Sequence, residues 1–168
     1  YTYLINLGTP FVMQVGDKKF NMKTDGFLPR NKAIECYHCR GNKLFGIKFN
    51  ISPIIFKTKV NFSEYREYIY PLSYLMEQAV IDNVKKAASF ENRVGILNEY
   101  FQSITRSYYG TWDAIHIVTH ILQYCNREND FTKTVEELAA QCNISARSLH
   151  RYFETTTSLS SKKALQVL

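Results

Sequence analysis

Long apolar runs are missing from this sequence. No stretch approaches the roughly 18 consecutive apolar residues that a membrane-spanning helix requires, and no charged and then apolar leader begins the chain. We therefore expect a soluble, cytoplasmic protein with no membrane partner. The chain starts at Tyr1 rather than at methionine, directly on a strand-like run, so we also expect a processed or trimmed fragment.

Cysteines are few, and they show no framework of the kind found in small secreted proteins. Cys125 and Cys142 fall within helical patterns, and only the run Cys36-Tyr37-His38-Cys39 suggests metal chemistry. A tetrahedral zinc site requires a second, separately spaced pair of ligands, and the sequence offers none. We expect the two thiols of this run to lie partly buried at strand positions, and we predict neither a metal nor a cofactor.

Titratable groups that could converge on a reaction centre are also scarce. Residues 1–60 hold one histidine, His38, and three carboxylates, none in a metal-ligand pattern such as H-x-H. His116 and His120 lie four residues apart on a predicted helix and could bind a metal together, but they lack the glutamate of H-E-x-x-H. We expect His120 to be a helix-surface residue. An enzyme of β-barrel type is therefore the weaker alternative, and we predict no catalytic residue.

The chain does contain a marked change of pattern. Residues 1–60 are rich in β-forming residues broken by turn signals such as Gly16-Asp17 and Asp25-Gly26, whereas residues 61–130 follow a helical period. Short strands at this spacing predict a small antiparallel barrel or sandwich, and the whole chain is then of the α+β class. The predicted strands are Tyr1–Leu7, Phe11–Val15, Lys19–Met22, Ala33–His38 and Leu44–Ile51.

The helical pattern of residues 61–130 contains one unusual stripe. The predicted helices are Ser63–Tyr70 and Leu72–Val84, broken at Pro71, then Ala88–Tyr108 and Asp113–Arg127. The third carries an apolar seam of period 3.5, which is typical of a coiled-coil face but also suits a helix packed on its own domain. The seam consists of Phe90, Val94, Leu97, Phe101, Ile104 and Tyr108. Our candidate residues for a homodimer interface are Val94, Leu97, Phe101 and Ile104.

Residues 131–168 contain the most informative pattern, the spacing of a helix-turn-helix over 134–153. Thr134, with Glu137 three residues later, forms a capping box that starts the first helix. Asn143 tolerates the positive φ that the turn requires, and Ser145 can cap the second helix. The small core between the helices is expected to consist of Leu138, Ala139, Cys142, Ile144, Leu149 and Tyr152. Two surface helices of an all-α bundle are the alternative.

The run LA-x-x-C-N-I-S-x-R-S-L-x-R-Y-F, followed by a polar stretch and S-S-K-K-A-L, resembles the first helix-turn-helix of AraC-type transcription regulators of bacteria. The matching residues are Leu138, Ala139, Ser145, Leu149, Arg151, Phe153 and Ser160. Ser158 stands where the family usually has glycine. The resemblance implies a cupin-like sensor domain over 1–60, connecting or dimerising helices over 61–130, and over 131–168 the first of two such motifs with the start of a linker helix. The second motif is absent.

The resemblance also implies which residues meet double-stranded DNA. The recognition helix, here 145–156, enters the major groove in this family. The base-contacting candidates are Arg147, His150 and Arg151. The phosphate-contacting candidates are Ser145, Ser148 and Lys162. Either arginine could instead be a solvated charge, or pair with Glu136 or Glu154.

The distribution of charge supports DNA binding only weakly. Residues 131–168 hold five Lys or Arg and three Asp or Glu, a net charge of +2, whereas residues 1–60 carry +7 and residues 61–130 carry −3. The sequence favours a sequence-specific DNA-binding regulator whose N-terminal part senses a small-molecule effector, for which apolar or aromatic compounds are suited, or mediates dimerisation. It leaves open a sensor or dimerisation module with little DNA binding of its own.

Overall fold

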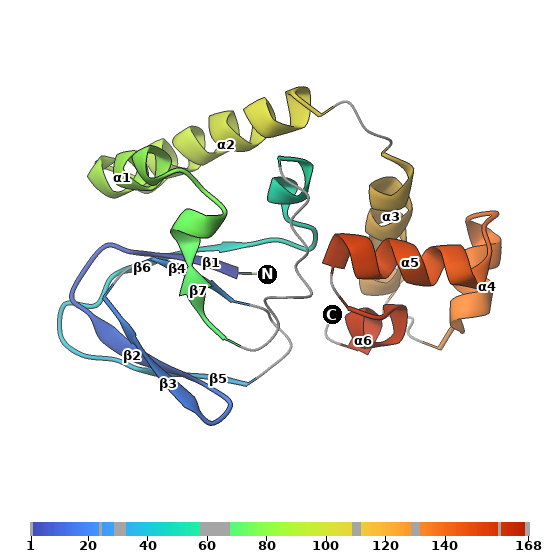
Figure 1. Cartoon of the computed structure of the whole chain (residues 1–168), viewed down its shortest axis with the longest axis horizontal. Coiled ribbons are helices and arrows are strands. Elements are labelled where there is room, and N and C mark those ends of the chain that lie inside the picture. Colours follow the sequence, from blue (N-terminus) through green and yellow to red (C-terminus); the bar gives the residue numbers. More distant parts are fainter. Residues whose placement is uncertain are drawn as a thin grey trace. The chain divides into compact units, whose positions relative to one another are not determined.

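The computed structural model describes residues 2–23, 25–28, 33–57, 68–108, 112–128, 132–157 and 159–166 (Figure 1). They divide into two compact units. The first contains residues 2–49, 53–57 and 68–108, and the second contains residues 50–52 together with those described from 112 onwards. The chain is α+β, as the sequence predicts, with two antiparallel sheets and a set of helices. No helix of the described residues is long and apolar enough to cross a membrane.

Two antiparallel sheets form the base of the first unit, in the orders β6-β1-β4-β7 and β3-β2-β5. The strands are β1 (Thr2–Asn6), β2 (Phe11–Val15), β3 (Lys18–Met22), β4 (Gly26–Leu28), β5 (Ile34–Tyr37), β6 (Leu44–Lys48) and β7 (Tyr70–Pro71). Leu4 and Leu28 of one sheet share a core with Phe11, Met13 and Met22 of the other. Among the described residues the sheets remain open, so they do not form the closed barrel that was one of the two predicted architectures.

The sequence did not predict strand β4. It predicted a turn at Asp25-Gly26, and this prediction is wrong. Gly26 lies within the strand, where a Cβ atom would come within 2.7 Å of Ile69 Cγ2, so the residue serves close packing. The buried Asp25 carboxylate accepts a hydrogen bond from the backbone N–H of Asn6 (2.9 Å) and pairs with Lys85 Nζ (2.7 Å). The predicted turn at Gly16-Asp17 is confirmed, since Gly16 (φ +61°) joins β2 to β3.

Among the described residues, the helices of the first unit are α1 (Gln78–Lys86) and α2 (Phe90–Arg106), and the 3₁₀ turns are η1 (Pro53–Phe56) and η3 (Leu72–Tyr74). The predicted helix Leu72–Val84 is wrong in its first half. Leu72 donates its N–H to the carbonyl of Asp25 (3.1 Å), the residue before β4, and this bond holds the segment in a short turn before α1. The predicted helix Ser63–Tyr70 lies mostly outside the described residues, and its last residue belongs to β7.

The apolar seam of α2 faces its own unit. Leu97 and Ile104 are buried, and the ring of Phe101 meets Phe49 edge-on with a centroid separation of 5.0 Å. Phe49 in turn contacts Tyr3 of β1 at 5.2 Å. These contacts agree with a helix packed on its own domain. The homodimer interface at Val94, Leu97, Phe101 and Ile104 stays a prediction.

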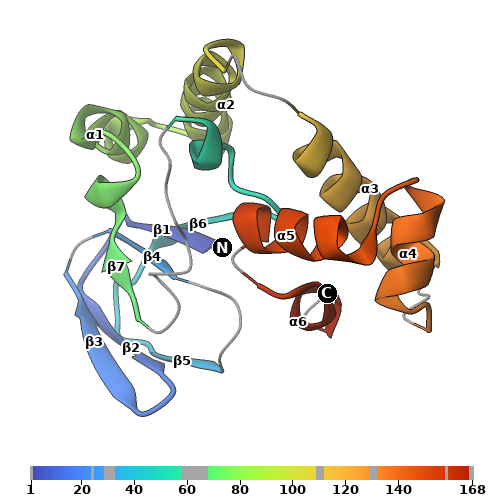
Figure 2. The same cartoon turned by 45° about the vertical axis from the view of Figure 1, so that its right-hand side comes forward.

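The second unit is helical and consists of α3 (Asp113–Glu128), α4 (Val135–Gln141), α5 (Ala146–Thr157) and α6 (Ser161–Gln166) (Figure 2). The segment 61–130 is thus divided, with α1 and α2 in the first unit and α3 in the second. One core joins the four helices. Its buried residues are Val118, Ile121, Leu122, Cys125, Leu138, Ala139, Leu149, Phe153 and Ala164.

Candidate nucleic-acid interface

The start of α4 is fixed by the predicted capping box. Thr134 Oγ1 accepts a hydrogen bond from the N–H of Glu137 (3.2 Å), while Glu137 Oε2 accepts one from the N–H of Thr134 (2.7 Å). Two N–H groups that a helix terminus leaves free are satisfied in this way. The capping box is therefore confirmed, with α4 beginning at Val135.

The turn between α4 and α5 also follows the sequence. Asn143 has the predicted positive φ, 54°, and its N–H donates to the carbonyl of Ala140. Ser145 Oγ accepts from the N–H of Ser148 (3.1 Å) and caps α5, and its hydroxyl donates to Ser148 Oγ (2.9 Å). The two serines, both candidates for phosphate contact, lie together at the start of α5.

The core behind α5 differs in two respects from the prediction. Leu138, Ala139 and Leu149 are buried as expected, while Cys142, Ile144 and Tyr152 are only partly buried against this core. Phe153, which the sequence did not assign to the core, is fully buried. Burial raises the pKa of the Cys142 thiol, which favours its protonated form.

The opposite side of α5 is exposed and carries four charged or titratable side chains, here called the α5 face: Arg147, His150, Arg151 and Glu154. Their spacing of three and four residues puts them on one side of a helix with 3.6 residues per turn. Leu149 and Phe153 lie on the other side, in the core. The three candidate base-contacting residues are therefore brought together on one accessible surface.

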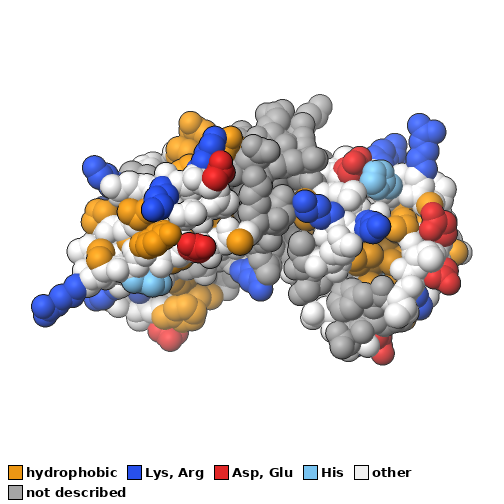
Figure 3. Space-filling model, turned by 90° about the horizontal axis from the view of Figure 1, so that it is seen from below, with side chains coloured by type: hydrophobic (Ala, Val, Ile, Leu, Met, Phe, Trp, Pro, Cys, Tyr) orange, Lys and Arg blue, Asp and Glu red, His pale blue; other side chains and the backbone are white. Residues whose placement is uncertain are grey.

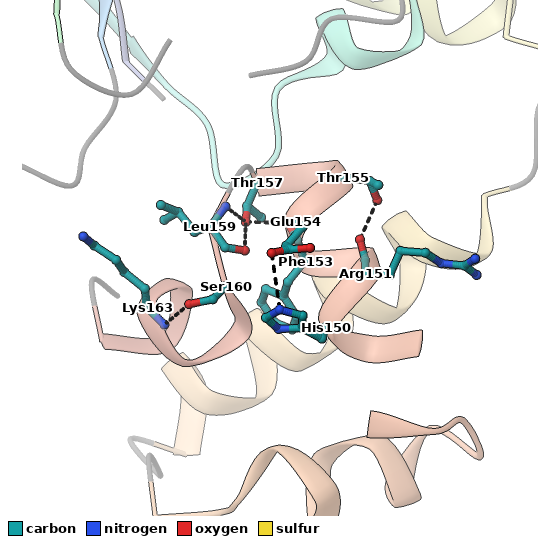
Figure 4. A network of polar contacts seen from close by, with 9 residues as sticks. All are labelled: His150, Arg151, Phe153, Glu154, Thr155, Thr157, Leu159, Ser160 and Lys163. Atoms are coloured by element: carbon teal, nitrogen blue, oxygen red, sulfur yellow. Dashed lines mark hydrogen bonds and ion pairs between the residues drawn. The ribbon is translucent and has the colours of Figure 1, made fainter. Parts of the chain in front are cut away.

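Ion pairing on the α5 face differs from the alternatives that the sequence left open. Glu154 Oε1 lies 3.3 Å from His150 Nε2, and neither Arg147 nor Arg151 forms an ion pair with any described residue. The guanidinium of Arg151 lies 5.6 Å from the ring of Tyr152. Figure 4 shows its side chain extended away from the His150–Glu154 pair. Both guanidinium groups therefore keep their charge available for an anionic partner.

The connection from α5 to α6 is held by two hydroxyl groups (Figure 4). Thr157 is buried, and its hydroxyl donates to the carbonyl of Phe153 (2.7 Å) and accepts from the N–H of Leu159 (3.2 Å). Ser160 Oγ accepts from the N–H of Lys163 (3.3 Å) at the start of α6. The third phosphate-contacting candidate, Lys162, is exposed on α6 and lines a groove of about 540 Å³ next to Lys133.

The surface of the second unit is mixed in charge. On the right-hand part of Figure 3, which is this unit, Lys and Arg side chains lie among Asp or Glu side chains and one His. The net charge of +2 over residues 131–168 agrees with this view. Attraction to phosphate over this surface is consequently modest.

Other candidate sites do not assemble into a centre. Among the described residues, no three His, Cys, Asp or Glu side chains are grouped so as to hold a metal. The thiols of Cys36 and Cys39 are both exposed, so the predicted partial burial is wrong; Cys39 lies beyond the end of β5, where its Sγ donates to the carbonyl of Pro10 (3.3 Å). His116 and His120 are both exposed on α3, and His116 stacks on Trp112.

The sequence did not predict a titratable cluster in the first unit, formed by Lys57, Glu77 and Tyr100 beside a cavity of about 320 Å³. Lys57 pairs with Glu77 and lowers the pKa of that carboxyl. Burial and the hydrogen bond with Glu77 raise the pKa of Tyr100 well above its ordinary value. These groups are far apart in the sequence, and no local pattern could have joined them. The opposite charges of Lys57 and Glu77 neutralise one another.

Comparison with known proteins adds no relative. No protein-family model, no curated protein and no solved structure matches the chain. The proposal for function below therefore rests on the residues of α4, α5 and α6 and on the family resemblance that the sequence carries.

Proposed function

We propose that the chain is a sequence-specific DNA-binding transcription regulator of AraC type, in which α4 and α5 form the helix-turn-helix and α5 is the recognition helix. The observation that carries the proposal is the α5 face. Arg147 and Arg151 point outward without an anionic partner among the described residues. Leu149 and Phe153, on the opposite side of the same helix, are buried in the core. An α-helix with its side chains, about 10–12 Å across, fits the major groove, which is about 12 Å wide.

Each candidate residue has a role that its chemistry suits. Arg147 and Arg151 can each donate two hydrogen bonds to O6 and N7 of a guanine, and His150 can donate to guanine or to a phosphate. The hydroxyl groups of Ser145 and Ser148 and the ammonium group of Lys162 can contact phosphates, which fixes the position of the helix without reading sequence. Base reading is thus assigned to α5, and backbone contact to its N-terminus and to α6.

The first unit is assigned to sensing a small effector or to dimerisation. This assignment rests on the family resemblance and on the order of the chain, with the β-rich part before the helix pair. A second candidate function is a sensor or dimerisation module with little DNA binding of its own. The low net charge of residues 131–168, +2, favours this alternative.

Replacing Arg151 by alanine tests the assignment of α5 to the groove. We expect Arg151→Ala to cost about 1–3 kcal/mol of binding free energy at the preferred site and to relax discrimination at one base pair. Lys162→Ala should weaken binding to all duplexes alike, because a phosphate contact carries no sequence information. Fluorescence anisotropy with duplexes that differ at single base pairs measures both effects. If Arg151→Ala is folded and keeps the affinity and base preference of the wild type, α5 does not read DNA.

The salt dependence of binding gives a second test. The logarithm of the binding constant changes with the logarithm of salt concentration by about −0.9 for each phosphate neutralised. Because the proposed interface has few cationic groups, we expect weak binding and a shallow slope, of magnitude below about 3. Titrations at several salt concentrations measure it. Nanomolar, sequence-specific binding with a steep slope would show that a much larger basic surface takes part.

A further inference from the structure

The α5 face carries one acidic side chain, Glu154, among basic ones. It follows Arg147 by seven residues and Arg151 by three, so all three stand on the same side of the helix. Its side chain is 50% exposed, and Oε1 lies 3.3 Å from His150 Nε2. Among the described residues, no hydrogen bond or ion pair involves Oε2. The carboxylate therefore presents an acceptor oxygen to the same surroundings as the two arginines.

A carboxylate at this position meets a restricted set of partners in a major groove. Phosphates repel it, and the O6 of guanine and the O4 of thymine are acceptors that cannot bond to it. The only base-edge donors in the major groove are the amino groups at N4 of cytosine and N6 of adenine. A carboxylate brought into the groove by α5 is therefore stabilised by an amino group or left without a partner.

We propose that Glu154 is a further specificity-determining residue, which accepts a hydrogen bond from the exocyclic amino group of a cytosine or an adenine. The inference rests on the proposed function, since it needs α5 in the major groove. Arg147 and Arg151 recognise hydrogen-bond acceptors on the bases. Glu154 adds a position that recognises a hydrogen-bond donor. A site selected by α5 then has cytosine or adenine on the strand that Glu154 faces, close to the guanine read by Arg151.

His150 gives the carboxylate a defined orientation before DNA arrives. The contact between Nε2 and Oε1 spans one turn of α5 and limits the rotamers of both side chains. Less conformational entropy is then lost when Oε2 meets a base than for an unrestrained glutamate. In this arrangement His150 positions Glu154 in place of donating to a base itself, and Glu154 contacts the base.

The test uses the full chain and a library of randomised duplexes, from which the wild type, Glu154→Ala and Glu154→Gln each select their preferred sites. Four duplexes with each of the four base pairs at the affected position are then titrated. The wild type should prefer cytosine or adenine at one position, and the four duplexes tell which. In Glu154→Ala, the ratio of affinities between the preferred duplex and the others should fall about tenfold. The base preferences at the other positions should stay unchanged. Glu154→Gln should favour adenine, because an amide can pair with N6 and N7 together.

Glu128→Ala is the matched control, because it removes the same charge from an exposed residue on α3, outside the α5 face. It should keep the base preference of the wild type. If Glu154→Ala instead strengthens binding to all four duplexes by one factor, Glu154 only repels phosphate and the inference is overturned. If the wild type binds DNA and both Glu154 variants keep its base preference, the inference about Glu154 is overturned while the proposed function stands. A wild type that selects no duplex overturns the proposed function and the inference together.

Discussion

Truncation of Phe153 to alanine is expected to lower the free energy of unfolding of the second unit by about 3–5 kcal/mol. The ring has no exposed surface, and it lies in the one core that α3, α4, α5 and α6 share. Removing it leaves a cavity that four short helices cannot close without losing other contacts. Thermal and urea unfolding, followed by circular dichroism, measure the loss.

The control for this variant is Arg147→Ala, on the exposed side of the same helix. It should change stability by no more than about 0.5 kcal/mol, as is usual for surface positions. Leu149→Ala, also fully buried, should resemble Phe153→Ala. A Phe153→Ala variant that unfolds like the wild type would mean that α5 does not pack on α3 as described.

A charge on the seam of α2 should have an effect of similar size on the first unit. Leu97 is 5% exposed, and an aspartate there would bury a charged carboxylate in the apolar core of this unit. We expect Leu97→Asp to cost more than about 4 kcal/mol and to unfold this unit. Analytical ultracentrifugation together with a thermal melt measures the outcome.

Asn98→Asp provides the matched comparison, because it puts the same charge on the next residue, which is exposed. It should leave the fold and the association state unchanged. A Leu97→Asp protein that stays folded while a wild-type dimer becomes monomeric would show instead that the seam is an interface between two copies. That result would support the interface predicted at Val94, Leu97, Phe101 and Ile104.

Local interactions made part of this fold predictable. The capping box of Thr134 and Glu137, the positive φ of Asn143 and the cap at Ser145 each depend on residues within four positions, and the structure contains all of them. The hairpin turn at Gly16 is of the same kind. A sequence pattern is sufficient wherever the interaction that fixes the backbone lies within a few residues.

Elements fixed by distant residues were not predictable. Gly26 belongs to a strand because Leu4 and Pro71 pair with it from either side, and Asp25 is buried with Lys85, sixty positions later, supplying a charge. The segment after Pro71 forms a short 3₁₀ turn instead of a continuous helix, because the N–H of Leu72 bonds to the carbonyl of Asp25. No local propensity contains these partners, and tertiary contacts decide such segments.

The candidate site shows the same limit. The period of α5 predicts that Arg147, His150 and Arg151 share a face, and they do. Which of them pairs with Glu154 depends on side-chain rotamers, because both Arg151 and His150 lie within one turn of it. The structure joins Glu154 to His150, and this leaves the guanidinium of Arg151 without that carboxylate.

The buried hydroxyl of Thr157 has a mechanical consequence. It bonds to α5 through the carbonyl of Phe153 and to the connecting chain through the N–H of Leu159, and Ser160 then starts α6. Bending between the end of α5 and Leu159 would stretch the hydrogen bond from the Leu159 N–H to the Thr157 hydroxyl, so this bond opposes a change of angle between α5 and α6. We therefore expect a phosphate contact made by Lys162 on α6 to influence the tilt of α5.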